Sequence, residues 1–130
     1  MKGKILLVDD TEFYIKLYKA KLLTEGYVVT TANNGLEAIK AITAEKPDVI
    51  LLDLVMPVMD GFKFLVTVKA DALLKNIPVV VFSGKGNSDE IGNAITAGAA
   101  DFLVKATTTP NKVVEKIQKI LAKSAGPAGG

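Results

Sequence analysis

The sequence of 130 residues contains no cysteine, no histidine and no arginine, and these absences narrow the chemistry open to it. Without cysteine the chain can form neither disulfides nor thiolate sites, and without histidine it lacks the usual zinc ligand and the usual base at neutral pH. Without arginine it lacks the side chain that most often reads bases and binds phosphates through paired hydrogen bonds. Any chemistry must therefore use carboxylates, hydroxyls, lysines or a hard metal ion held by oxygen.

The overall charge and hydropathy predict one compact domain without a direct nucleic-acid partner. The formal net charge is only +2, and the apolar fraction of 49% is typical of a globular protein rather than a disordered one. The first apolar run ends at Asp9 and is too short for a signal peptide or a membrane span. We therefore expect a soluble, cytoplasmic protein that does not bind a membrane.

Short apolar runs alternate with segments of helical spacing along the chain. The runs predicted to be strands are residues 5–8, 27–32, 49–52, 79–82 and 102–104. Several of them are apolar throughout instead of alternating, which indicates a sheet covered on both faces. Because crossovers between parallel strands are right-handed, this order predicts an α/β fold with a doubly wound, five-stranded parallel sheet and five helices.

Polar side chains directly follow four of these apolar runs. They are Asp9, Asp10, Asp53, Ser83 and Lys105. The carboxyl ends of parallel strands meet at one edge of the sheet, where ligands bind in such folds. With the first and third strands adjacent, the three carboxylates converge there. A hard cation such as Mg²⁺ would relieve their repulsion. A phosphoryl group would in addition give the lysine and the hydroxyl a function, which makes phosphoryl transfer the favoured chemistry.

The sequence closely resembles the receiver domains of two-component response regulators, in particular the single-domain chemotaxis regulators. The resemblance covers about residues 4–121 and rests on segments 5–10, 48–61, 81–84 and 98–105. It implies a flavodoxin-like fold with strand order 2-1-3-4-5, an order that the chemotaxis member of the family illustrates. We accordingly expect a receiver domain over residues 1–123 and a flexible, glycine-rich tail over residues 124–130.

The resemblance implies a role for each acidic residue at this edge. Asp53 corresponds to the phospho-acceptor, and its phosphoryl group would come from a sensor histidine kinase or a phosphotransfer protein. Asp10 corresponds to a direct Mg²⁺ ligand, whereas Asp9 would act mainly through metal-bound water. The backbone carbonyl of Val55 would be a further ligand. The chain is thus expected to be a signalling protein with weak phosphorylation and dephosphorylation activity of its own, not a turnover enzyme.

The resemblance also implies a switch on the other side of the site. Lys105 would pair with the phosphoryl group, Ser83 would move toward it, and the aromatic side chain of Phe102 would move inward in response. The family usually has a proline directly after this lysine, often with a cis bond, but Ala106 follows here. A cis peptide bond before a residue other than proline costs about 3–4 kcal/mol. The alanine therefore predicts a trans bond or a remodelled loop.

Two further positions bear on how long the phosphoryl group would last. In the family, the side chains two residues after the acceptor and two residues after the hydroxyl influence the attacking water. Here they are Val55 and Lys85, and neither is a carboxylate or amide that would orient water. We therefore expect slow self-dephosphorylation.

The last predicted helix carries four lysines on one stripe, at positions 112, 116, 119 and 123. A solvated face with cations near the helix end is the plain interpretation, and a docking surface for an acidic partner is the alternative. In the family, the fourth helix, fifth strand and fifth helix often form the output or dimer face, so a downstream protein is expected there. The chain itself is expected to be a monomer or a weak dimer.

Three other functions remain as alternatives. A pseudo-receiver that docks without phosphate is the main one, and Lys105 turned away from Asp53 would favour it. A haloacid-dehalogenase-type phosphatase needs an acid two residues after its first-strand nucleophile, where this chain has Thr11 after Asp9. A flavin carrier needs a hydroxyl- and glycine-rich loop after the first strand, which the two aspartates replace.

Overall fold

The structure is a computed structural model that describes residues 3–56, 58–84 and 86–129, with side chains described as far as residue 123. Its strands are β1 (Lys4–Val8), β2 (Val28–Ala32), β3 (Val49–Leu52), β4 (Val79–Ser83) and β5 (Asp101–Val104). Its helices are α1 (Glu12–Thr24), α2 (Gly35–Ala44), α3 (Gly61–Ala70), α4 (Ser88–Thr96), the short 3₁₀ helix η1 (Lys105–Thr107) and α5 (Pro110–Gly129).

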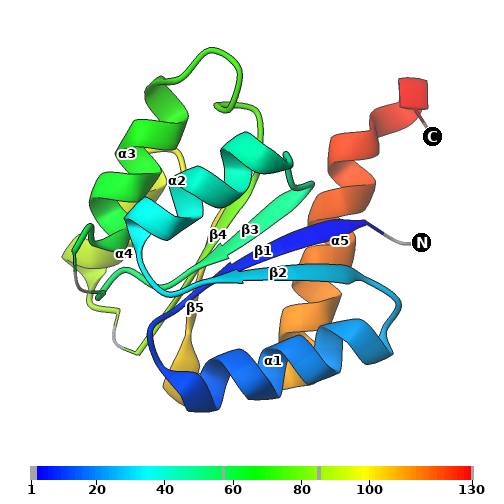
Figure 1. Ribbon diagram of the computed structural model, residues 1–130, viewed down its shortest axis with the longest axis horizontal. Coiled ribbons are helices and arrows are strands. Elements are labelled where there is room, and N and C mark those ends of the chain that lie inside the picture. Colours follow the sequence, from blue (N-terminus) through cyan, green and yellow to red (C-terminus); the bar gives the residue numbers. More distant parts are fainter. Residues whose placement is uncertain (1–2, 57, 85, 130) are drawn as a thin grey trace.

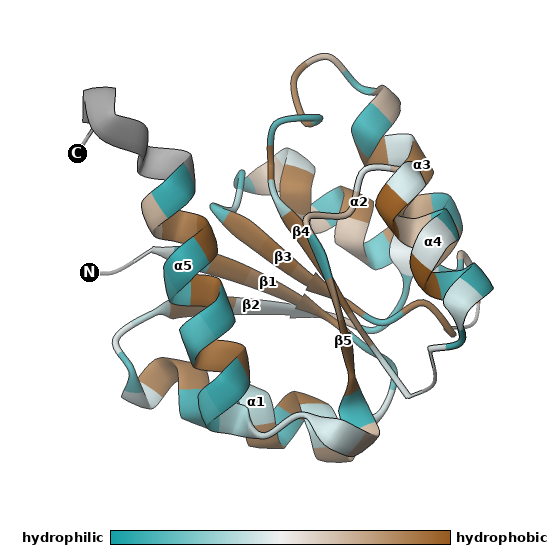
Figure 2. Ribbon diagram, turned by 180° about the vertical axis from the view of Figure 1, so that it is seen from behind, coloured by the Kyte–Doolittle hydropathy of each residue, from teal (hydrophilic) through white to brown (hydrophobic). Residues whose placement is uncertain are grey.

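All five strands pair in parallel in the order β2-β1-β3-β4-β5, which confirms the predicted fold and strand order. Helices α1 and α5 cover one face of the sheet, and α2, α3 and α4 cover the other (Figure 1). Figure 2 shows the resulting contrast between the apolar central strands and the mixed surface of α5. None of the described helices is long and apolar enough to cross a membrane.

Successive residues of the central strands enter two different hydrophobic cores. In β1, Leu6 and Val8 pack toward α2, α3 and α4, whereas Ile5 and Leu7 pack toward α1 and α5. Side chains alternate across a strand, so a strand buried on both faces must be apolar at every position. This alternation explains why the central strands read as uninterrupted apolar runs.

The register of the sheet brings the ends of the neighbouring strands level. Val8 of β1 lies beside Leu52 of β3, and the N–H of Asp53 donates to the carbonyl of Val8 at 2.9 Å. The N–H of Asp9 donates to the carbonyl of Ala32 at 3.0 Å. The first residues past β1 and β3 are therefore fixed side by side by backbone hydrogen bonds.

The loop between β3 and α3 is held closely against the strand that it leaves. Asp60 caps α3 by accepting a hydrogen bond from the N–H of Lys63, and the N–H of Gly61 donates to the carbonyl of Leu54 at 2.9 Å. A Cβ at Gly61 would lie 2.0 Å from the carbonyl oxygen of Asp53. Glycine is needed there because α3 starts directly against the backbone at the end of β3.

In the second half of the chain, one expectation from the sequence is confirmed and one feature differs. The backbone after β5 forms the 3₁₀ turn η1 at Lys105, and the described residues contain no cis peptide bond, so the bond to Ala106 is trans, as the alanine predicted. Helix α5 extends to Gly129, beyond Ser124, where the tail was expected to begin. The flexibility of residues 124–130 stays a prediction.

Candidate functional site

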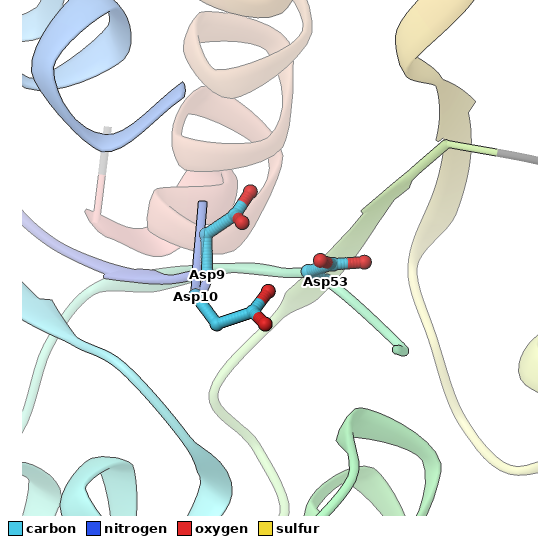
Figure 3. A group of neighbouring side chains, drawn as sticks. All are labelled: Asp9, Asp10 and Asp53. Atoms are coloured by element: carbon cyan, nitrogen blue, oxygen red, sulfur yellow. The ribbon is translucent and has the colours of Figure 1, made fainter. Parts of the chain in front are cut away.

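Three carboxylates meet at the carboxyl edge of the sheet, as the sequence predicted. Figure 3 shows Asp9 and Asp10 after β1 and Asp53 after β3, with side chains directed toward a common space. One oxygen from each lies within 4.8 Å of the others. Asp9 and Asp53 are only 1% and 5% exposed, whereas Asp10 is exposed to solvent. Such a set of hard oxygen donors could hold a metal ion.

Asp9 has a structural contact and an electrostatic one. Its Oδ1 accepts a hydrogen bond from the N–H of Thr11 at 2.9 Å, at the start of α1. Its Oδ2 lies 2.6 Å from the Nζ of Lys105. The buried Asp9 is thus paired with the ammonium group of Lys105, whereas the carboxylate of Asp10 is exposed to solvent.

The carboxylate of Asp53 accepts hydrogen bonds from three donors. The backbone N–H of Val55 and the Oγ of Ser83 donate to Oδ1 at 3.3 and 3.4 Å, and the Nζ of Lys105 donates to Oδ2 at 3.4 Å. Burial nevertheless raises the pKa of Asp53; the ammonium of Lys105 lowers it, and the charge of Asp9 raises it further. These long contacts orient the carboxylate without fully compensating its negative charge.

Lys105 is the buried cation of the site. It reaches across from the end of β5, its side chain is 6% exposed, and its ammonium group lies within ion-pair distance of both Asp9 and Asp53. The ring of Tyr14, on the first turns of α1, lies over the ammonium group with 4.2 Å between Nζ and the ring centroid. Phe82 lies farther away, at 5.7 Å. The predicted position of Lys105 opposite Asp53 is therefore observed.

An open cavity of about 570 Å³ lies beside these groups. Its lining consists of Asp10, Thr11, Tyr14, Asp53, Val55, Ser83, Gly84, Glu90 and Lys105. Tyr14 and Glu90 are not among the site residues predicted from the sequence. For Tyr14, the available signal was its position one helical turn after Asp10; for Glu90, nothing in the sequence distinguishes it from a solvated residue in the first turn of α4.

Phe102 lies outside this cavity lining, in β5. Its side chain is partly buried and packs against the core that faces α2, α3 and α4. A Cβ at Gly86 would lie 2.7 Å from its Cε1, so the loop before α4 passes directly over the ring. Val55 points its side chain into solvent, 77% exposed, while Lys85, the other position linked to phosphoryl lifetime, lies outside the described residues.

Comparison with known proteins gives a consistent result for sequence and fold. The family described as the response regulator receiver domain matches residues 5–118. The response regulator PleD of Caulobacter vibrioides is 42% identical over 106 residues, which cover 81% of this chain but 23% of that protein. The chemotaxis protein CheY of Bacillus subtilis is 36% identical over 93% of this chain and 99% of its own length.

Solved structures agree with these matches. The chemotaxis protein CheY4 of Vibrio cholerae superposes with a TM-score of 0.85 at 30% identity, covering 91% of this chain and 98% of the other. Several curated relatives are much longer: the chain spans about half of the regulatory protein PhoP of Bacillus subtilis, at 33% identity. Whatever the remaining parts of such proteins do is not contained in the region compared.

Proposed function

Because the chain belongs to the response regulator receiver domain family, a family of phosphorylation-based signalling switches, we propose that Asp53 accepts a phosphoryl group and that the phosphorylated chain signals by protein contact. The observation that carries this proposal is the environment of Asp53. Its buried carboxylate faces an open cavity, with the hydroxyl of Ser83 and the ammonium group of Lys105 each 3.4 Å away. Nucleophile, cation and hydrogen-bond donor are therefore within reach of one incoming group.

The proposed transfer needs little beyond positioning and charge neutralisation. An oxygen of Asp53 forms a bond to phosphorus while the bond from phosphorus to the donor nitrogen breaks, and the electron pair of that bond leaves with the donor imidazole. Lys105 neutralises part of the charge on the phosphoryl oxygens, and Ser83 donates a hydrogen bond to one of them. The product is an acyl phosphate on the protein itself, so the chain acts as a signalling protein and is not a turnover enzyme.

Mg²⁺ fits the donor set on the opposite side of Asp53. Asp10 offers a solvent-accessible carboxylate, and Asp9, Asp53 and the backbone carbonyl of Val55 complete the proposed oxygen ligands. Three carboxylates against one ammonium group leave the site with excess negative charge, which favours a divalent cation. When bound, Mg²⁺ would neutralise charge on the transferring phosphoryl group.

We further propose that the signal leaves the site through Ser83 and Phe102. If Ser83 turns toward a phosphoryl group on Asp53, it vacates volume beside β4 that Phe102 can enter from the neighbouring strand β5. The proposed output surface is the face of α4, β5 and α5, to which Lys116 and Asp101 contribute a partly exposed ion pair at 2.6 Å. Replacing the stripe lysines of α5 by glutamate should weaken binding of an acidic partner and leave phosphorylation unchanged.

The expected partners are a sensor histidine kinase or phosphotransfer protein as donor, and a downstream protein as receiver of the signal, in the cytoplasm. A phosphate-independent docking module is the main alternative. It is favoured by a lysine turned away from the acceptor, but here Lys105 lies between Asp9 and Asp53. That arrangement supports a phosphorylated site over a docking module.

The proposal is tested by Mg²⁺-dependent labelling with acetyl phosphate, comparing the native chain with Asp53→Asn. We expect label on the native chain only, and only with Mg²⁺ present. Equal labelling of both chains would refute Asp53 as the acceptor, and no labelling of either would favour the docking module. Because Val55 is apolar, the label should persist for minutes without a phosphatase; loss within seconds would contradict slow self-dephosphorylation.

A further inference from the structure

The ammonium group of Lys105 has neighbours on three sides, and one of them is an aromatic ring. Two are the carboxylates of Asp9, at 2.6 Å, and Asp53, at 3.4 Å. The third is the face of Tyr14, whose centroid lies 4.2 Å from Nζ. An ammonium group has three N–H donors and no acceptor, so this environment offers one partner for each of them.

The lysine side chain needs such support because its own backbone does not fix it. Four carbons with rotatable bonds separate the ammonium group from the chain, and a strongly hydrated charge is easily drawn toward water. Open water is close, since Lys105 and Tyr14 both line the cavity beside Asp53. The ring occupies a side of the ammonium group that water would otherwise reach.

Contacts with other aromatic side chains hold the ring of Tyr14 in place beside the ammonium group of Lys105. Its ring stacks on Tyr18 at 6.4 Å between centroids and meets the edge of Phe82 at 6.0 Å. Tyr18 and Phe82 are 2% and 1% exposed and belong to the core beneath α1 and α5. The ring therefore extends a rigid aromatic cluster from the core up to the charged site.

We propose that Tyr14 is a positioning residue for Lys105, keeping its ammonium group between Asp9 and Asp53 and aimed into the phosphorylation cavity. The inference rests on the proposed phosphorylation of Asp53. A cation–π contact is broad in direction, so the ammonium group can shift from Asp9 toward an incoming phosphoryl group without leaving the ring face. Without the ring, the side chain of Lys105 would populate several water-exposed rotamers. A smaller fraction of the molecules would then have its ammonium group in position for the phosphodonor.

The test compares phosphorylation by acetyl phosphate in Mg²⁺ for the native chain, Tyr14→Phe, Tyr14→Leu and a chain with a trifluorinated phenylalanine at position 14. Tyr14→Leu should lower the limiting rate by about tenfold, the effect of losing one desolvated cation–π contact. Tyr14→Phe keeps the ring and should stay within about twofold of the native rate. The fluorinated ring keeps the shape but loses the negative face, so it should resemble leucine.

Phe13→Leu is the matched control. Phe13 is the neighbouring aromatic on α1, 66% exposed, and its ring packs edge-on against Tyr14. The rings that lie near the ammonium group of Lys105 are those of Tyr14 and Phe82. This variant should label at the native rate. A loss of rate equal to that of Tyr14→Leu would show that the aromatic surface of α1 matters in general, and would overturn the specific role of Tyr14.

A second measurement reports on the contact itself. The ε-methylene protons of Lys105 should show an upfield ring-current shift in the NMR spectrum, assigned by the signal missing in Lys105→Met. The shift should persist in Tyr14→Phe and vanish in Tyr14→Leu, even without any phosphodonor. Absence of the shift in the native chain would refute the contact between the ring and the ammonium group.

The outcomes separate the two proposals. If the native chain is not labelled at Asp53, the proposed function fails, and the NMR shift still decides the lysine–ring contact. If the native chain is labelled and the fluorinated ring reacts as fast as Tyr14→Phe, the positioning role is refuted. The latter comparison also holds if Tyr14→Leu fails to fold, because both aromatic variants preserve the packing on Tyr18 and Phe82.

Discussion

Val58, in the loop between β3 and α3, has a backbone angle that its side chain disfavours. Its φ is +66°, which makes it the one residue other than glycine with positive φ in the described part of the chain. The β-branched side chain crowds the backbone in this left-handed region, whereas asparagine adopts it far more readily. We predict that Val58→Asn stabilises the protein.

The size of the effect follows from the strain and from the exposure of the side chain. A left-handed backbone costs an ordinary residue about 1–2 kcal/mol, and asparagine recovers roughly half or more of that. Val58 is 78% exposed, so removing its methyl groups gives up little buried apolar surface. The expected gain in the free energy of unfolding is about 1 kcal/mol, or about 4 °C in Tm for a domain of this size.

Urea and thermal unfolding, followed by circular dichroism without Mg²⁺, would measure this gain. Val55→Asn is the control, because Val55 is a valine of the same loop that is 77% exposed and has no positive φ. It should change stability by less than about 0.5 kcal/mol. If both variants gain equally, or if Val58→Asn is destabilising, strain at Val58 is not the cause and the reasoning is wrong.

Three further predictions concern the site. Burial raises the pKa of Asp53 above its unfolded value, so the ionised carboxylate lowers stability at neutral pH, and this penalty disappears as the pH falls through the folded pKa. Asp53→Asn should therefore stabilise the Mg²⁺-free protein at pH 7, with a gain that shrinks in acid; urea titrations showing destabilisation at pH 7 would contradict this. Mg²⁺ at a hundredfold excess over its Kd should raise the free energy of unfolding by about 2.7 kcal/mol, and Asp10→Asn should remove most of that gain in thermal melts. Gly61→Ala would place a Cβ 2.0 Å from the carbonyl of Asp53 and should cost about 3 kcal/mol in denaturant unfolding; a native midpoint would show that the helix start can relax.

The fold could be predicted from the sequence because two patterns agree: uninterrupted apolar runs, and polar residues directly after them. Runs such as Ile5 to Val8 are apolar at every position, and the structure divides them between two cores on opposite faces. Polar candidate site residues follow four of the five runs at the same edge, and the backbone hydrogen bonds of Asp9 and Asp53 keep the ends of the neighbouring strands level. The convergence of the carboxylates followed from parallel topology together with the neighbouring position of β1 and β3, a strand order that the resemblance implied.

What the sequence could not supply were contacts between side chains that are distant along the chain. The approach of Tyr14 to Lys105 depends on how α1 is rotated against β5, and periodicity places a residue on a face without giving that rotation. The 3₁₀ turn at Lys105 arises where no proline fixes the backbone, and a run of threonines gives no periodic signal for it. Glu90 also lines the cavity, although nothing in its local sequence distinguishes it from a solvated residue in the first turn of α4.

The two distances at Lys105 would allow one lysine to serve the site before and after the proposed phosphorylation. Before transfer, the most buried carboxylate, Asp9, holds the ammonium group at 2.6 Å, and Asp53 holds it less tightly at 3.4 Å. The proposed phosphorylation would replace the single charge of Asp53 with a group of charge about −2 that lies farther into the cavity. Lys105 is the one cation among the described residues lining that cavity, so the balance of attraction would shift from Asp9 toward the phosphoryl group. A lysine bound only to Asp9 would resist this shift, whereas one placed between two carboxylates and against a ring can make it by a small movement.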